Sequence, residues 1–469
     1  MSPSNTRLEH DLLGDLPVPA EAYYGIQTAR ALENFDISGV ELRHYPNLIK
    51  AFAMVKLAAA RANHDCGQFS VEILRGIEGA CQELIAGKLH EQFALDVFQG
   101  GAGTSTNMNA NEVIANRALE LMGHQKGEYR YCDPHDHVNG SQSTNDAYPT
   151  SLHVGMALGN VELVAAVNEL IAAFRAKGRE FGAIVKMGRT QLQDAVPMTL
   201  GQEFMAFGQT LAGEVQALEA IQHVLCETNM GATAIGTGLN APPGYARKCT
   251  DHLATITGFP ITLAEDLIEA TQDTQAFVLY SSAMKSLAIK LSKVCNDLRL
   301  LSSGPRCGLR EINLPARQPG SSIMPGKVNP VIPEVVNMVC YRVIGSDLTV
   351  TMAAEGGQLQ LNVFEPVIAA CIFEAQTMFV NAVRTLRTRC VEGITANPEV
   401  CRHYVEYSIG TVTALNPVIG YDRSTALAAE AMQTGRGILE LIREKQILTE
   451  DQIRTVLDPA AMTGQNRPD

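Results

Sequence analysis

Residues 264–303 read AEDLIEATQDTQAFVLYSSAMKSLAIKLSKVCNDLRLLSS, a run of forty residues without a glycine or a proline. Glycine and proline are the residues that most often interrupt a helix, so this stretch predicts a helix over most of its length. At about 1.5 Å per residue such a helix spans roughly 50 Å. Helices this long are unusual in globular domains unless partners of similar length cover them. The stretch therefore predicts a bundle of long helices.

Four other segments supply partners for this helix. In 161–174, VELVAAVNELIAAF, apolar residues recur at the three- and four-residue spacing of an amphipathic helix. The same spacing runs through 200–225, and the segments 333–355 and 366–391 are two further candidates. The central region is predicted to be a bundle of about five long helices.

The whole chain is predicted to be all-α and to form three mostly helical domains. The first, residues 1–141, mixes short helical patterns with Gly-rich connections such as FQGGAGTSTNMNANEV. The second, 142–396, holds the bundle. The third, 397–469, ends in LTEDQIRTVL, where Thr449 and Gln452 fit a capping box. We find neither a sheet-forming core nor an internal repeat.

Composition and charge narrow the functional classes. Hydrophobic residues make up 46% and charged residues 19% of the 469 residues, which is typical of a folded soluble protein. The formal net charge is −13, so no excess of Lys and Arg is available to neutralise nucleic-acid phosphates. Nucleic-acid binding is therefore not expected, whereas a small anionic substrate needs only a few local positive groups.

The cysteines and the apolar stretches indicate a cytoplasmic protein. The eleven cysteines are scattered and form no CxxC pair, which favours reduced structural thiols over disulfides or a zinc site. The N-terminus MSPSNTRLEHDLLGD has no apolar signal core. The apolar stretches, such as VIAACIF, are expected to be too short to span a membrane.

Two of the predicted bundle helices are apolar on more than one side. PEVVNMVCYRVI and PVIAACIFEAQTMFV carry apolar residues around most of the helix circumference. Such helices need burial on both flanks, either inside one thick core or against other subunits. We expect a homo-oligomer.

Four stretches concentrate hydroxyl and amide side chains. They are GAGTSTNMN at 101–109, HVNGSQSTND at 137–146, MGRTQLQDA at 187–195 and GSSIMPGKVNP at 320–330. Any one of them alone could be no more than a capped helix start. Because helix N-termini with hydroxyls and free N–H groups bind anions well, the four together suggest a pocket for a small dicarboxylate.

The stretch GSSIMPGKVNP closely resembles the signature of the aspartase/fumarase superfamily, lyases that eliminate a group β to a carboxylate and release fumarate. The resemblance covers nearly the whole chain, including AYYGIQTARALENF, QGGAGTSTNMNANEV, HDHVNGSQSTNDAYPT, KMGRTQLQDAVPMTLGQEF, GATAIGTGLN, EDLIEATQD, CNDLRLLSSGPRCGLREINLP and MAAEGGQLQLNVFEPVI. It implies the family's three-domain helical fold, in which the five-helix bundles of four subunits form the twenty-helix core of a homotetramer. It also implies active sites that are shared between subunits.

Within the superfamily the chain is most similar to aspartases, with class II fumarase second. LMGHQKGEYRY and MGRTQLQDAVPMTLGQEF are similar to aspartase sequences, whereas fumarases typically carry histidine where this chain has Gln191. A glutamine cannot supply a proton near neutral pH. The resemblance thus implies reversible conversion of L-aspartate into fumarate and ammonia. A non-catalytic helical homologue is a remote alternative, since it predicts damaged polar loops and Ser321, Lys327 and Asn329 are all present.

The resemblance identifies Ser321 as the base that removes the Cβ proton. A free serine hydroxyl is a poor base, so it must become an alkoxide, stabilised by nearby loop N–H groups and by the charge of Lys327. Gly320 and Gly326 are expected to let the backbone approach closely, and the prolines to fix the turns. The loop would close over the substrate and exclude water.

The other site residues are also implied by the resemblance. Lys327 and Asn329, with Thr190, would hold the α-carboxylate, and Asn145 and Gln191 would face the amino group. The β-carboxylate, where negative charge grows, would be held by Thr104, Ser143, Thr144 and Ser322.

Two loop neighbours complete this set. Met324 is counted among the substrate-binding residues. Glu334 would orient Lys327 or Asn329, with a plain helix-start glutamate as the alternative.

No metal site or required cofactor is predicted. His135 and His137 have HxH spacing, but no third ligand is evident in the sequence. Divalent-ion activation, which the family resemblance allows, cannot be located. GTGLN at 236–240 is expected to be a tight turn near the active site, and Asp146 a helix cap.

Overall fold

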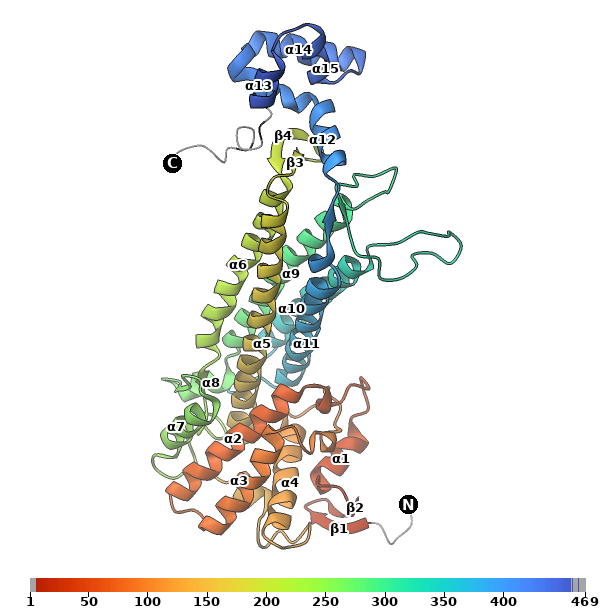
Figure 1. Cartoon of the computed structure of the whole chain (residues 1–469). Coiled ribbons are helices and arrows are strands. Elements are labelled where there is room, and N and C mark those ends of the chain that lie inside the picture. Colours follow the sequence, from red (N-terminus) through yellow and green to blue (C-terminus); the bar gives the residue numbers. More distant parts are fainter. Residues whose placement is uncertain (1–5, 457, 459–462, 464–469) are drawn as a thin grey trace. The chain divides into compact units, whose positions relative to one another are not determined.

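The computed structural model describes residues 6–456, 458 and 463, and they are mainly helical (Figure 1). Contacts divide the chain into two compact units. Unit 1 comprises Met1–Val164, Gln216–Ala288 and Tyr341–Val380, and unit 2 comprises Ala165–Val215, Ile289–Cys340 and Asn381–Asp469. The three-domain division expected from the sequence stays a prediction.

Five long helices are present, as predicted for the central region. They are α5 (Thr144–Glu180), α6 (Leu200–Val224), α9 (Gln275–Leu301), α10 (Val331–Glu355) and α11 (Glu365–Arg389). Each contributes residues to both units. The mainly α-helical fold class is thereby confirmed.

The stretch that predicted the bundle is interrupted once. Instead of one helix over most of 264–303, it forms the short α8 (Leu267–Gln272) and then α9, whose 27 residues span about 40 Å. The break falls at Asp273, whose side chain accepts a hydrogen bond of 2.8 Å from Gln275 N. Aspartate side chains compete with helical backbone bonds in this way, so a helix can end without glycine or proline.

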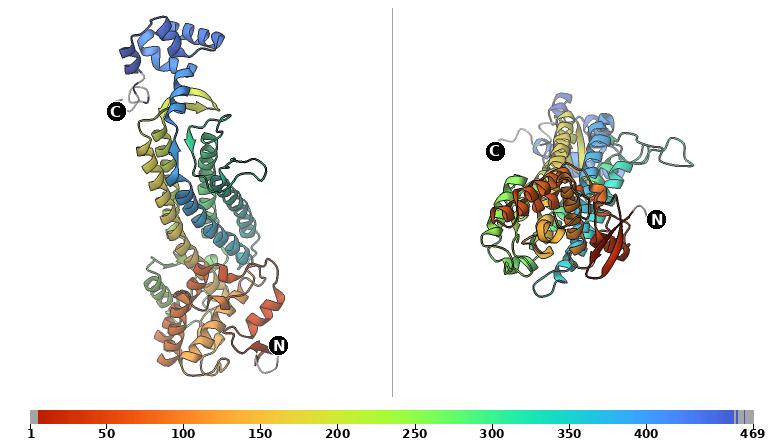
Figure 2. Two further views of the ribbon diagram at one scale, coloured as in Figure 1. Left: turned by 45° about the vertical axis from the view of Figure 1, so that its right-hand side comes forward. Right: turned by 90° about the horizontal axis from the view of Figure 1, so that it is seen from below.

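Unit 1 begins with the hairpin of β1 (Thr6–Asp11) and β2 (Gly14–Pro19), followed by α1 (Ile26–Asn34). Its other separate helices are α2 (Pro46–Asp65), α3 (Val71–Ile85), α4 (Thr104–Leu121) and α7 (Tyr245–Thr257). α3 packs on both α2 and α4, and α2 also packs on α7. A two-stranded parallel pair, β5 (Glu227–Thr228) and β6 (Thr262–Leu263), lies before α8. Figure 2 shows these helices gathered beside the start of α5.

A buried glutamine connects three long helices in unit 1. Gln376 of α11 donates hydrogen bonds to Met156 O of α5 at 2.9 Å and to the Tyr280 hydroxyl of α9 at 2.6 Å. A Cβ on Gly159 would lie 2.5 Å from the Gln376 side-chain amide, so a larger residue there would displace this amide. α10 is joined to α9 through Asp347, which accepts hydrogen bonds from Ser281 and Lys285.

Unit 2 contains the hairpin of β3 (Val185–Thr190) and β4 (Gln193–Thr199), and the pair β7 (Ile312–Asn313) and β8 (Thr395–Ala396). Its separate helices are α12 (Pro398–Tyr407), α13 (Val412–Ile419), α14 (Tyr421–Thr434), α15 (Ile438–Glu444) and α16 (Glu450–Val456). Thr449 and Gln452 exchange hydrogen bonds in front of α16, which confirms the predicted capping box.

Two further expectations can be compared with the structure. All eleven cysteines are free, as expected. The expectation that the apolar stretches are too short to span a membrane is wrong, because helices 144–180 and 365–393 are long and apolar enough to cross one. However, 50% and 72% of their apolar windows are buried inside the protein, as in the core helices of soluble proteins.

The Gln376 contact generates a stability prediction. Gln376→Met keeps the side-chain length but leaves the buried Tyr280 hydroxyl without its donor, so the free energy of unfolding should fall by about 1–3 kcal/mol. Urea denaturation at fixed protein concentration measures this change. The matched control Gln433→Met, on an exposed position of α14, should change it by less than about 0.5 kcal/mol. Equal effects of the two substitutions would contradict the assigned role of Gln376.

Candidate active site

Two helix starts meet in unit 1 and carry the first group of predicted site residues. α4 begins at Thr104 and α5 begins at Thr144. Asn107, one turn into α4, donates a hydrogen bond of 3.1 Å to Thr144 Oγ1. Both N-termini therefore lie close together, and the positive ends of their helix dipoles add in a region that also presents hydroxyl groups.

The turn before α4 has an unusual backbone. Gly101, Ala102 and Gly103 all have positive φ angles, of 91°, 55° and 86°. A Cβ on Gly103 would lie 2.5 Å from the ring of Tyr148, so the close approach of this turn to α5 requires glycine. The turn places the Thr104 hydroxyl at an exposed position, where it donates to Gly101 O at 2.8 Å.

The start of α5 is held by Asp146. One carboxylate oxygen accepts a hydrogen bond of 2.9 Å from Ser143 N, and the other accepts bonds of 3.0 Å from Gly231 N and Thr233 N. The prediction that Asp146 caps a helix is confirmed. Asn145 donates to Ala234 O at 2.7 Å, so the segment just before the predicted tight turn at 236–240 lies beside this group.

A buried lysine binds the segment that precedes α5 from the interior of the protein. Lys56 of α2 is fully buried, and its ammonium donates to Asn139 Oδ1 at 3.1 Å and to Gln142 Oε1 at 2.8 Å. Burial lowers the pKa of Lys56 to about 7, opposed by the nearby Asp146. Burial also raises the pKa of Asp146 to about 6, opposed by its hydrogen bonds. The uncharged donors at the start of α5 thus lie near two buried titratable groups, Lys56 and Asp146.

The predicted residues Thr190 and Gln191 lie in unit 2, at the end of the β3–β4 hairpin. Thr190 pairs with Gln193, so Gln191 and Leu192 form a two-residue turn. Their φ angles are 54° and 63°. Positive φ at both central positions is the geometry that hairpins usually build with asparagine and glycine, so this turn is strained.

Hydrogen bonds join the two ends of the loop 320–330. Gly320 N donates to Lys327 O at 2.6 Å, and Asn329 Nδ2 donates to Gly320 O at 2.8 Å. A Cβ on Gly320 would lie 2.8 Å from Asn329 N, and Gly326 has a φ of 81°. The expected close backbone approach is confirmed at Gly320; at Gly326 no atom lies within 4 Å of a Cβ, and glycine is favoured there by the positive φ instead.

Within this loop, Ser321 receives backbone donors. Its Oγ accepts hydrogen bonds of 3.2 Å from Ile323 N and 3.0 Å from Met324 N. Donors at this atom favour a negative charge on the oxygen, which is what a serine alkoxide requires. Ser322, Met324 and Lys327 are exposed on the loop.

The end of the loop meets a cavity of about 210 Å³, lined in part by Arg310, Asn313 and Asn329. Glu334 follows in the first turn of α10. Its expected orienting role stays a prediction.

The predicted site residues thus fall into two groups, one in each unit. Unit 1 holds Thr104, Ser143, Thr144 and Asn145, and unit 2 holds Thr190, Gln191, Ser321, Ser322, Met324, Lys327, Asn329 and Glu334. Sequence reasoning missed the buried residues behind each group, Lys56 and Glu311. A lysine inside the apolar pattern of helix 46–65 is the signal that could have indicated Lys56.

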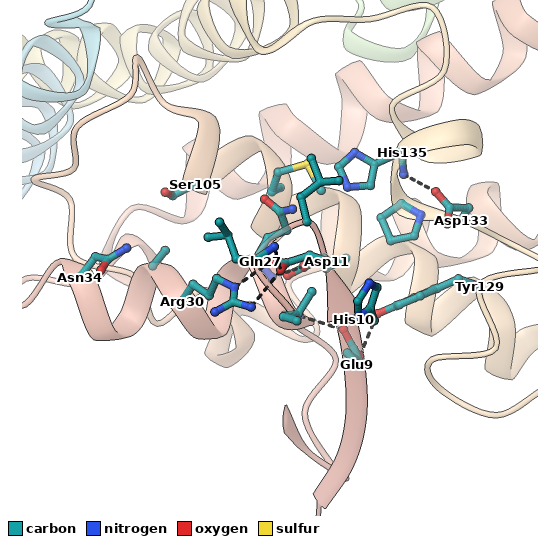
Figure 3. Close-up of a pocket in the computed structure, with 17 residues that line it drawn as sticks. Glu9, His10, Asp11, Gln27, Arg30, Asn34, Ser105, Tyr129, Asp133 and His135 are labelled. Atoms are coloured by element: carbon teal, nitrogen blue, oxygen red, sulfur yellow. Dashed lines mark hydrogen bonds and ion pairs between the residues drawn. The ribbon is translucent and has the colours of Figure 1, made fainter. Parts of the chain in front are cut away.

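A second cavity, of about 650 Å³, lies in unit 1 between β1, α1 and α4 (Figure 3). It contains none of the predicted site residues. Its charged groups are already paired: Arg30 donates twice to Asp11, at 2.8 Å each, and Tyr129 donates to Glu9 at 3.0 Å. These polar groups hold the hairpin against the helices, and we do not assign the cavity to the active site.

The HxH pair serves a local turn. Asp133 N donates to His137 Nδ1 at 2.8 Å, and His135 N donates to Asp133 Oδ1 at 2.7 Å. Among the described residues, no group of three or more His, Cys, Asp or Glu side chains could hold a metal ion.

Comparisons with known proteins agree with this picture. Residues 14–345 match a family model described as lyase, and residues 412–464 match one described as fumarase C C-terminus. The chain is 60% identical to an aspartate ammonia-lyase of Pseudomonas aeruginosa over 464 residues, which cover 98% of each chain. It is 55% identical to that of Escherichia coli over 451 residues, covering 96% of this chain and 94% of the relative.

Two solved structures are also similar. A structure described as fumarate lyase:delta crystallin from Brucella melitensis, bound to cobalt, has a TM-score of 0.94 and 54% identity, and covers 97% of this chain and 99% of the relative. A class II fumarase from Schistosoma mansoni has a TM-score of 0.90 and 35% identity, with coverages of 98% and 100%.

The buried Lys56 predicts a pH dependence of stability. Its pKa falls from 10.5 to about 7 on folding, so the unfolded chain binds more protons between these pH values. The free energy of unfolding should therefore gain a contribution that is complete above pH 10.5 and is lost as the pH falls through about 7. Comparison of wild type with Lys56→Met by urea denaturation isolates this contribution.

The difference in stability between the two proteins should grow in favour of wild type as the pH rises across that range. Lys50→Met, which changes a less buried lysine of the same helix, is the matched control and should run parallel to wild type. Parallel curves for Lys56→Met as well would show that Lys56 does not titrate in this way.

Proposed function

Because the chain belongs to the lyase family of the aspartase/fumarase superfamily, we propose that it is an aspartate ammonia-lyase, a carbon–nitrogen lyase that converts L-aspartate reversibly into fumarate and ammonia. The main support for this choice is the sequence identity of 55% to 60% with aspartate ammonia-lyases over nearly the whole chain, against 35% with a class II fumarase. Gln191 agrees with this choice, since its amide cannot exchange protons as the histidine typical of fumarases can.

The reaction requires a base and a set of fixed donors. Removal of the Cβ proton leaves an electron pair that the neighbouring β-carboxylate accepts as an aci-carboxylate with two negative charges. This pair then forms the Cα–Cβ double bond while the C–N bond breaks, and the nitrogen leaves as ammonia with the bonding electrons. Donors aimed at the β-carboxylate stabilise the charge where it develops.

Ser321 is the proposed base. The alkoxide takes the Cβ proton and becomes a hydroxyl. Donation to Ser321 Oγ from the N–H groups of Ile323 and Met324 supports this role, since both bonds strengthen when the oxygen is negative. Lys327, on the same loop, adds a positive charge. Closure of the loop over the substrate would keep water from reprotonating the alkoxide.

The substrate's two carboxylates are assigned to different groups. The helix starts at Thr104 and Thr144, with Ser143 and Ser322, would bind the β-carboxylate, because uncharged donors there stabilise the developing charge. Lys327 and Asn329, with Thr190, would bind the α-carboxylate, while Asn145 and Gln191 face the amino group. Met324 would contact the substrate from the loop, and Glu334 would orient Lys327 or Asn329.

We further propose a homotetramer whose active sites combine the two groups from different subunits. An exposed apolar row on α10 supports self-association: Val335, Met338, Tyr341, Leu348 and Met352 are 43%, 65%, 58%, 65% and 61% exposed. Their spacing of three, four or seven residues places them on one face of the helix. A row of this kind is stable in water when a second subunit covers it.

The remaining proposals concern the cellular compartment, the binding partners and the cofactors of the enzyme. The enzyme is proposed to be cytoplasmic, to act on the small molecules L-aspartate and fumarate, and to bind neither nucleic acid nor membrane. No cofactor is proposed to be required. Divalent-cation activation stays possible for the superfamily without an assigned site in this chain.

The proposed activity is tested by mixing the purified protein with L-aspartate or with L-malate and following fumarate by its ultraviolet absorbance. Fumarate should appear from L-aspartate with release of ammonia, because Gln191 and the high identity favour elimination of the amine. Fumarate from L-malate but not from L-aspartate would instead indicate a fumarase. Fumarate from neither would favour a non-catalytic homologue.

Ser321→Ala tests the base. Loss of the proton acceptor should lower kcat by about 10²–10⁴-fold while the oligomer and fumarate binding stay intact. The neighbouring Ser322→Ala removes one donor to the β-carboxylate and should lower kcat/KM by only about 10–100-fold. Steady-state kinetics and size-exclusion chromatography give both readouts. Normal turnover in Ser321→Ala would remove Ser321 from the base role.

A further inference from the structure

Glu311 is a fully buried carboxylate that lies between two cations in unit 2. Its Oε2 is 2.7 Å from Lys186 Nζ, and its Oε1 accepts a hydrogen bond of 2.6 Å from Arg189 Nη1. The side chain has no exposed surface. A carboxylate so deeply buried is stable only because both of its oxygens face a positive charge.

Both cations lie on β3, directly before the turn assigned to substrate binding. Arg189 precedes Thr190, and Lys186 lies three residues earlier on the same strand. The guanidinium of Arg189 also lies over the ring of Tyr404, 5.3 Å from its centroid. The end of β3 is therefore fixed by side chains that are buried or packed, although Thr190 and Gln191 are themselves exposed.

The turn needs such support because its own residues do not favour it. Gln191 and Leu192 both adopt a left-handed backbone, with φ of 54° and 63°. Residues with a Cβ rarely adopt this conformation, and it persists where surrounding contacts hold it in place. The ion pair of Arg189 lies one residue before Thr190, at the end of β3 that leads into the turn.

Glu311 is in turn fixed to the frame of unit 2 by its own backbone. Its N–H donates to Leu301 O at 2.9 Å, and its carbonyl accepts a hydrogen bond of 2.9 Å from Asn397 N. Nine residues further along the chain, Gly320 opens the loop that carries Ser321. One carboxylate thus ties the substrate-binding turn to the segment that leads into the loop of the base.

We propose that Glu311 is a positioning residue for the substrate, acting through Arg189 to hold Thr190 and Gln191 where they bind the α-carboxylate and the amino group. The proposal rests on the proposed aspartate ammonia-lyase function. Thr190 and Gln191 would contact the substrate both in the enzyme–substrate complex and in the transition state. Loss of their positioning therefore weakens substrate binding more than it slows the chemical step.

A purely structural role for this ion cluster makes a different prediction, and Glu203 provides the matched control. Glu203 of α6 accepts a hydrogen bond of 2.6 Å from the same Lys186. Its interaction within the cluster is with Lys186 alone, whereas Glu311 also binds Arg189. If the cluster served only stability, removal of either carboxylate would affect catalysis equally.

The test compares Glu311→Gln with Glu203→Gln in the full-length protein, using L-aspartate kinetics and thermal denaturation. Glu311→Gln should raise KM by about tenfold or more with a smaller change in kcat, and Glu203→Gln should leave KM within about twofold of wild type. A wild-type KM in Glu311→Gln, or equal changes of KM in the two variants, would overturn the proposal.

Arg189→Lys keeps the charge but loses the planar guanidinium that reaches Glu311 Oε1 and lies over the Tyr404 ring, so it provides a second test if Glu311→Gln does not fold. It should raise KM in the same direction; where Glu311→Gln does fold, the double variant should raise KM little further, because both substitutions break one interaction. Additive effects, or a wild-type KM in Arg189→Lys, would overturn the proposal. If the wild-type protein forms no fumarate from L-aspartate, the proposed function fails as well; if it does and KM is unchanged by these substitutions, only the role of Glu311 fails.

Discussion

Close packing between long helices is the constraint on which the rest of this structure depends. In unit 1, a Cβ on Gly155 would lie 2.8 Å from the ring of Phe373, and one on Gly159 would lie 2.5 Å from Gln376. These glycines let α5 and α11 approach closely enough for the buried Gln376 to donate hydrogen bonds to Met156 and Tyr280. Because α5 cannot shift against α11 without steric overlap, its first residues, Thr144 and Asn145, and the preceding Ser143 are held in place.

The two groups of site residues are built on the same physical plan. In each, exposed or half-buried uncharged donors lie next to charged groups of the interior: Lys56 and Asp146 near the start of α5, and Lys186 and Glu311, with the half-buried Arg189, behind the β3–β4 turn. Buried charges are costly unless they are fully partnered, so they hold their neighbours in one geometry. A site that must stabilise a developing charge benefits from donors that are already fixed before the substrate arrives.

Much of the fold could be predicted from the sequence because its signals are local. The absence of helix breakers and the three- and four-residue apolar spacing indicated five long helices, and Thr449 with Gln452 marked the start of α16. The prediction failed where side chains compete with the backbone, as at Asp273, which ends α8 without any glycine or proline. It also missed the short strand pairs, which depend on residues distant in the chain such as Ile312 and Ala396.

For the site, the sequence by itself determined which residue types are available, that 320–330 is a loop, and the family to which the chain belongs, because these follow from local composition and from motifs such as GSSIMPGKVNP. Only the tertiary structure decided which buried groups stand behind those residues. Glu311 lies more than 120 residues from Lys186 and Arg189 along the chain, yet folding places its two oxygens 2.7 Å and 2.6 Å from their nitrogens. The physical reason is that a carboxylate removed from water is destabilised unless cations lie beside it. Those cations come from distant parts of the chain, so no local sequence pattern reveals the contact.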